Sequence, residues 1–150
     1  MFYEIISAPA KYQILEENKV RAEVLIQLTD QDVQHARIYD CKNKIYYQSD
    51  FDISLTRVPG ISRSVYYLDR EVVRFIYQDI YSCRIQTCHE EFYTIQIHKE
   101  TIDIMEDTHG KKVAVITMNP YNNHSHIQFY EGLNENLRLA MALFPCIRFI

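Results

Sequence analysis

Residues 135–150 of the chain read ENLRLAMALFPCIRFI, and this stretch decides how the rest of the sequence is interpreted. Apolar residues dominate it so strongly that a helix formed here has hardly any polar side. Such a helix is buried on all sides or lies in a membrane. A helix over residues 137–150 would be about 21 Å long, against about 30 Å of hydrocarbon in a bilayer. We therefore expect a core helix at about residues 133–146, not a transmembrane one, with Asn134 as its N-cap and Pro145 kinking or ending it.

The residues before this helix alternate between apolar and polar side chains, as the strands of a half-buried sheet do. In the run YSCRIQT, for example, Tyr81, Cys83 and Ile85 share one face. About a dozen such short runs follow one another and are rich in β-branched and aromatic residues, which strands favour. The pattern predicts a mainly β, antiparallel fold of roughly twelve strands, either a barrel or a sandwich. This fold would enclose the helix as a single domain over residues 1–150.

Two turns share a pattern of residues that is typical of hairpins. They occur in the runs IYDCKNKIYY and IMEDTHGKKVAV. Asp40 and Asp107 can accept hydrogen bonds from the backbone that follows them, and Asn43 and Gly110 suit the left-handed conformation that closes such a turn. We therefore expect consecutive antiparallel strands joined by tight turns.

Together with the closing LNENLRLAMALFPCIRFI, these hairpins resemble the tubby C-terminal-like superfamily. That superfamily includes tubby itself, phospholipid scramblases, the plant LURP-one-related proteins and short bacterial members of about this length. The resemblance covers most of the chain as a pattern of elements, and it implies a twelve-stranded barrel around a central hydrophobic helix. It implies less about chemistry. Tubby binds phosphoinositides through a basic surface, but we match none of those positions to this sequence.

The net charge and the cysteines indicate which kinds of partner and which cellular compartment to expect. The net charge is −4, which argues against a nucleic-acid partner unless a local basic patch exists. No basic start followed by an apolar run precedes the four cysteines, so we expect free thiols in the cytoplasm. A peripheral position at the membrane is compatible with this expectation.

Histidine and cysteine occur close together in two runs, which raises the question of a metal site. Cys83, Cys88 and His89 lie in CRIQTCH, but on a strand the two thiols point to opposite faces. His124 and His126 share a face, yet they lie in a run with the composition of a loop. Zinc needs about four nitrogen or sulfur ligands. We therefore expect neither a metal nor a cofactor.

Enzyme motifs are missing from the sequence: there is no Gly-x-Ser-x-Gly, phosphate-binding glycine loop or His-Glu-x-x-His. We therefore expect a non-enzymatic binding module. Two alternatives stay open, namely a small enzyme whose site no motif reveals and a regulatory protein that binds nucleic acid through a local patch.

Five arginines fall within one short stretch of this acidic chain, and their guanidinium groups suit phosphate and carboxylate ligands. We predict that they form an anion-binding surface for a lipid headgroup or an acidic protein partner. The alternative is that they pair with Asp69, Glu71 and Asp79 and only keep the surface hydrated. The five are Arg57, Arg63, Arg70, Arg74 and Arg84.

Overall fold

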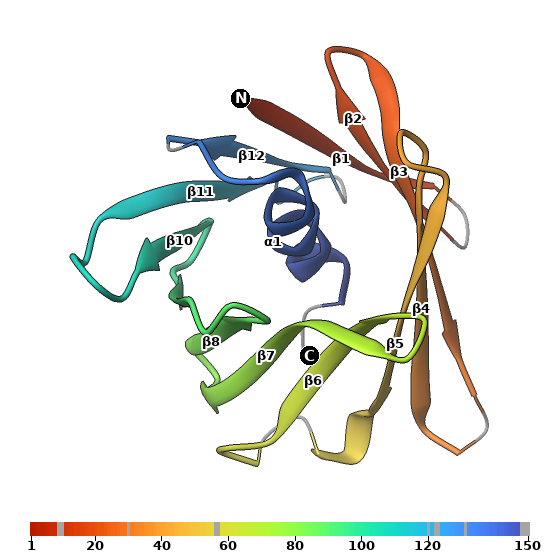
Figure 1. The fold of residues 1–150 in the computed structure, drawn as a ribbon, viewed down its shortest axis with the longest axis horizontal. Helices are drawn as coiled ribbons and strands as arrows, with labels where there is room; N and C mark the ends of the chain where they lie inside the picture. The colour runs from red at the N-terminus through yellow and green to blue at the C-terminus, as the bar shows by residue number, and fades with distance from the viewer. Residues whose placement is uncertain are drawn as a thin grey trace.

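Twelve antiparallel strands form a closed barrel with an α-helix inside it (Figure 1). The computed structural model describes residues 1–8, 11–29, 31–55, 58–119, 121, 124–130 and 132–147. The elements are β1 (Phe2–Ala8), β2 (Lys11–Glu16), β3 (Lys19–Leu28), β4 (Val33–Asp40), β5 (Ile45–Asp52), the short 3-10 helix η1 (Ile53–Leu55), β6 (Ser62–Tyr67), β7 (Arg70–Asp79), β8 (Ser82–Thr87), β9 (Phe92–Ile97), β10 (Thr101–Glu106), β11 (Lys112–Met118), β12 (Ser125–Phe129) and α1 (Glu135–Ile147).

Each strand pairs with the next one in the chain, and β1 pairs with β12 to close the ring. At the closure Tyr3 lies opposite Ile127 in an antiparallel register. The structure therefore confirms the barrel and excludes the sandwich. Closure also removes the exposed strand edges that an open sheet would leave.

Alternation along the strands divides the side chains between the core and solvent, as the sequence predicts. On β9, Tyr93 and Ile95 are buried, whereas Thr94 and Gln96 between and after them are partly exposed. The inward side chains of the strands and the buried side chains of α1 belong to one hydrophobic core. The helix thus supplies the centre that twelve strands cannot fill alone.

Helix α1 begins where the sequence predicts and ends one residue later. The Oδ1 atom of Asn134 accepts a hydrogen bond from the backbone N–H of Leu137 at 2.8 Å, so Asn134 is the N-cap. All seven residues of Met141–Ile147 are buried. The helix continues through Pro145, so of the two expectations for this proline, a kink or an end, the end is excluded. Pro145 lacks the N–H that would bond the carbonyl oxygen of Met141, which removes one backbone hydrogen bond from the helix.

The turn between β4 and β5 is held by a buried carboxylate. Asp40 Oδ1 accepts the N–H groups of Lys42 at 3.0 Å and Asn43 at 3.1 Å, as expected. The left-handed residue is Lys44, with φ of 55°, and the assignment of that conformation to Asn43 is wrong. Asn43 instead uses its side-chain amide to donate to Asp40 Oδ2 at 2.9 Å.

The turn between β10 and β11 follows a different plan. Gly110 has φ of 63°, which confirms its left-handed conformation. Asp107, in contrast, accepts hydrogen bonds from the Arg84 guanidinium at 2.7 Å and the Thr94 hydroxyl at 2.6 Å. The side chain of Asp107 therefore ties the turn to β8 and β9 on the outside of the barrel.

One junction in the barrel wall, which we call the β5–β6 seam, has little backbone pairing. Only Gln48 and Tyr66 are in register there, whereas β4 and β5 pair along all of β4. Side chains bridge the seam instead: Ser49 Oγ donates to the carbonyl oxygen of Ser64 at 2.8 Å, and Arg63 Nε donates to Ser49 Oγ at 2.8 Å. Side-chain hydrogen bonds therefore join the two strands of this seam, whereas backbone hydrogen bonds join the strands at the other junctions.

Candidate functional site

A cavity of about 100 Å³ lies between α1 and one side of the barrel wall, and we call it the crescent cavity. Its floor is apolar and buried. Its mouth is polar and opens at the end of the barrel where α1 begins, and Tyr47 lies between floor and mouth. The floor consists mainly of Ile38, Val65, Val73, Leu137, Leu139 and Leu143. The mouth carries Thr87, Cys88, His89, Glu91, Asn134 and Asn136.

The cavity exists because α1 does not lie on the axis of the barrel. The helix lies closest to β3 and β12, which are near one another in the ring, and the cavity faces the opposite wall. On β3 the small side chain of Ala22 points inward and allows this close approach. On the opposite wall Phe75 extends to Phe144 of the helix, with ring centroids 5.8 Å apart. Side-chain size thus sets the position of the helix.

Charged groups tie the first turn of α1 to the wall. Glu135 pairs with Lys42 on the β4–β5 turn and lies 3.7 Å from Nη2 of Arg21 on β3. Arg21 in turn donates to Asp40, and both side chains are buried. Burial alone would raise the pKa of Asp40, but hydrogen bonds from Arg21 and Asn43 outweigh it and hold that pKa below its usual value. The ion pairs therefore keep their charges at neutral pH and fix the helix off centre.

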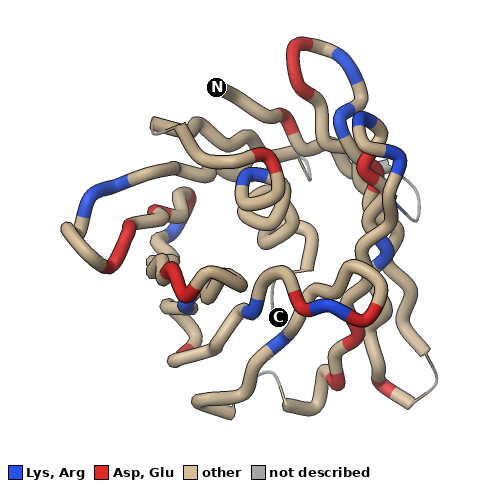
Figure 2. Tube along the Cα trace, in the orientation of Figure 1, with Lys and Arg blue, Asp and Glu red and all other residues tan. Residues whose placement is uncertain are grey.

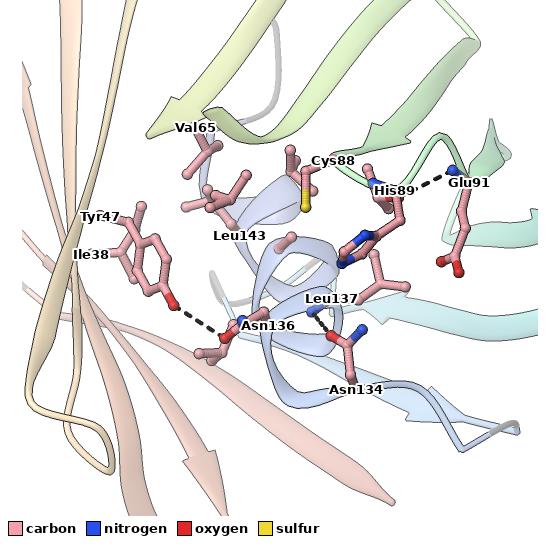
Figure 3. Close-up of a pocket in the computed structure, with 15 residues that line it drawn as sticks. Ile38, Tyr47, Val65, Cys88, His89, Glu91, Asn134, Asn136, Leu137 and Leu143 are labelled. Atoms are coloured by element: carbon pink, nitrogen blue, oxygen red, sulfur yellow. Dashed lines mark hydrogen bonds between the residues drawn. The ribbon is translucent and has the colours of Figure 1, made fainter. Parts of the chain in front are cut away.

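A second contact joins the wall and the helix across the cavity itself. The hydroxyl of Tyr47 on β5 donates to Oδ1 of Asn136 at 3.1 Å (Figure 3). Burial raises the pKa of Tyr47, so the phenol stays protonated and remains a donor. This bond defines the edge of the mouth on the β5 side.

On the other side of α1 the mouth is formed by the turn between β8 and β9 (Figure 3). The Thr87 hydroxyl accepts the N–H groups of His89 at 3.3 Å and Glu91 at 3.2 Å. The Thr87 N–H donates to the Glu91 carbonyl oxygen at 2.9 Å, and Glu90 takes the left-handed conformation with φ of 61°. These bonds fix the backbone of the turn at His89 and Glu91.

The predicted anion-binding arginines that the structure describes do not all lie on one surface. Arg57 lies outside the described residues. Arg63 is only 1% exposed and lies inside the barrel wall, so its assignment to an exposed anion-binding surface is wrong. Arg70 is exposed at the start of β7, and Arg74 and Arg84 are partly exposed on β7 and β8.

Arg63 points inward because it shares a strand face with Val65, and no carboxylate lies within ion-pair distance of it among the described residues. Besides the bond to Ser49, its Nη1 donates to Oε1 of Gln34 at 2.6 Å, and its guanidinium lies 5.3 Å from the centre of the Phe51 ring. Burial lowers the pKa of Arg63 to about 10, so the group is still charged at neutral pH. Its role is to bridge the β5–β6 seam.

Arg74 and Arg84 are already engaged with carboxylates on the outside of the barrel. Arg74 pairs with Glu71 at 3.1 Å, as the alternative interpretation predicts, and Arg84 pairs with Asp107 at 2.7 Å. The Arg84 guanidinium also lies 4.6 Å from the centre of the Phe92 ring. Figure 2 shows Lys and Arg interspersed with Asp and Glu around the ring of strands rather than gathered on one side.

The candidate metal ligands are separated by the fold. Cys83 is buried inside the barrel, whereas Cys88 and His89 are exposed at the cavity mouth. His124 and His126 lie near Phe2 at a groove over β1 and β12. In the described part of the chain, no group of three or more His, Cys, Asp or Glu side chains is arranged to hold a metal ion.

The described residues contain no helix that is both long enough and apolar enough to cross a bilayer. Comparison of the chain with models of protein families, with curated proteins and with solved structures found no match. The candidate site therefore has to be interpreted from its own geometry.

Sequence reasoning missed the crescent cavity. It considered His89 only as a metal ligand and gave no role to Glu91, Tyr47 or Asn136. A partial signal existed, because Asn136 falls on the first turn of a helix whose other residues are apolar. Nothing in a strand pattern, however, shows which wall a central helix approaches.

Proposed function

We propose that this protein is a non-enzymatic binding domain whose ligand site is the crescent cavity. The apolar part of a small amphipathic ligand would lie on the floor between α1 and β4–β7, and its polar part would project through the mouth. The observation that carries the proposal is the combination of a buried apolar floor with polar groups gathered at one open end. Ligand sites are commonly of this kind.

The size of the cavity limits the ligand. An apolar cavity of about 150 Å³ holds benzene, so about 100 Å³ accommodates four or five carbon atoms. Burial of each methylene contributes about 0.8 kcal/mol, so a pentyl chain gains about 4 kcal/mol and binds at best with a millimolar Kd. Tighter binding of a larger ligand would have to come from contacts at the mouth.

We propose the cavity rather than an anion-binding surface because Arg63 is buried, and Arg74 and Arg84 are already paired with carboxylates. Membership of the tubby C-terminal-like superfamily stays a proposal as well, supported by the twelve-stranded barrel around a helix. A binding role without chemistry fits both proposals.

The test is a titration with n-pentanol followed by NMR of the methyl groups. We expect shifts for Val65, Val73, Leu139 and Leu143 on the floor, and none for Ile14, which is buried on β2 at the far wall. An unchanged spectrum at concentrations well above millimolar would refute the proposal.

A cavity-filling variant gives the control. Ala140→Leu adds three carbon atoms at a partly buried position on the floor and should abolish the pentanol shifts. Because filling a void is usually tolerated, its melting temperature should stay close to that of the wild type. If it does not fold, Val73→Ile adds one methyl group and should weaken the binding instead.

A further inference from the structure

We infer that the crescent cavity selects a ligand with an ammonium head over one with a carboxylate head. The inference rests on the proposed function, and it follows from the charges and hydrogen-bonding groups at the mouth. Among the described residues that line the cavity, Glu91 is the acidic one and none is Lys or Arg; the Glu91 carboxylate also interacts with the hydroxyl of Tyr93. An anionic head would meet the charge of Glu91 with no Lys or Arg in the lining to balance it.

Hydrogen-bond acceptors gather at the mouth from both sides of the cavity (Figure 3). Asn136 Oδ1 accepts one bond from Tyr47, and Asn134 Oδ1 accepts one from the helix backbone. Each amide has a second lone pair on its oxygen and an NH2 group that donates, so Asn134 and Asn136 can bind either kind of head. The carboxylate of Glu91 adds acceptors that an ammonium group, with its three donors, can use and a carboxylate head cannot.

The positive end of α1 does not favour an anion at this mouth. A helix N-terminus carries about half a positive charge on its free N–H groups. Here Asn134 caps one of those groups, and the carboxylate of Glu135 lies on the first turn. Lys42 on the β4–β5 turn is bound to Glu135, and the guanidinium of Arg138 donates to the carbonyl oxygen of Leu133. The partial positive charge at the N-terminus of α1 is therefore already offset by groups of the protein.

The experiment compares three probes that share one chain length: n-pentylamine, n-pentanol and pentanoate. We expect all shifts to map to the same floor methyl groups, with pentylamine binding most tightly and pentanoate most weakly. Glu91→Gln should weaken pentylamine binding about two- to fivefold, as expected for one exposed ion pair, and should leave pentanol binding unchanged.

The matched control is Glu100→Gln. It removes the same charge from an exposed residue between β9 and β10, at the opposite end of the barrel. It should leave the order and affinity of the probes unchanged.

The outcomes separate the two proposals. If none of the probes binds, the cavity is not a ligand site and both proposals fail. If pentanol binds but pentanoate binds as tightly as pentylamine, the cavity remains a ligand site and the ammonium preference is overturned. Equal losses in Glu91→Gln and Glu100→Gln would also overturn it, because the preference would then reflect net charge and not the mouth.

Discussion

Replacement of Arg63 tests what holds the β5–β6 seam together. The side chain is 1% exposed and carries its charge into the barrel wall without a carboxylate partner among the described residues. Burial lowers its pKa from 12.5 to about 10, which corresponds to about 3 kcal/mol against the charged form. Hydrogen bonds to Ser49 at 2.8 Å and Gln34 at 2.6 Å return about 1.5 kcal/mol or more each, because the donor is charged. The free-energy cost of burying the charge and the gain from its hydrogen bonds therefore nearly cancel.

We expect Arg63→Met to change the free energy of unfolding by no more than about 1 kcal/mol, because methionine keeps most of the volume without the charge. Arg63→Ala should cost about 2 kcal/mol or more, since it leaves a void next to Phe51. The measurement is urea unfolding at pH 7, followed by tyrosine fluorescence and circular dichroism.

Arg74→Met is the matched control, because Arg74 is a partly exposed arginine on the adjacent strand and pairs with Glu71. It should change stability by about 0.5 kcal/mol or less. The reasoning is refuted if Arg63→Met destabilises the protein as much as Arg63→Ala. In that case the polar contacts of the guanidinium, and not its bulk, hold the seam.

Three further predictions concern the helix, a turn and the buried carboxylate. Leu139→Asp should prevent soluble folding, seen as insoluble expression, because an unpaired buried charge costs several kcal/mol. Gly110→Val should lower stability by about 1–2 kcal/mol through backbone strain alone, because an added Cβ meets nothing within 4 Å; an unchanged melting temperature would contradict this. Since its pKa is depressed in the folded state, Asp40 contributes stability above the unfolded carboxyl pKa of about 4 and loses it as the pH falls further. Asp40→Asn should therefore be less stable at pH 7 and show a shallower loss between pH 5 and pH 2, measured by urea unfolding.

The fold could be predicted from the sequence because two patterns of apolar residues indicate it. Alternation predicted the strands, and the apolar run after Asn134 predicted an enclosed helix. The inward direction of Arg63 was also accessible, since it is two residues from Val65 on the same strand. Clustering along the chain was given more weight than the alternation of inward and outward side chains, which is why Arg63 was wrongly placed with the other arginines on the outside.

The cavity was not accessible, because its position depends on the sizes of side chains that face one another across the barrel. Ala22 permits close approach on one wall and Phe75 prevents it on the other, yet they come from strands that are not neighbours. The pattern of a single strand contains no information about such a pair.

The order of the elements has a consequence for the protein as the ribosome makes it. Helix α1 follows all twelve strands in the chain. The ring closes only when β1 pairs with β12, the last strand. Because chains emerge from their N-terminus at about 5–20 residues per second, every strand leaves the ribosome before the helix that its inner face will cover. Until residues 135–147 have been synthesised, the apolar inner face of the strands therefore has no helix to pack against. Closure of the barrel around its helix is a late step, and the emerging strands need protection from aggregation until it occurs.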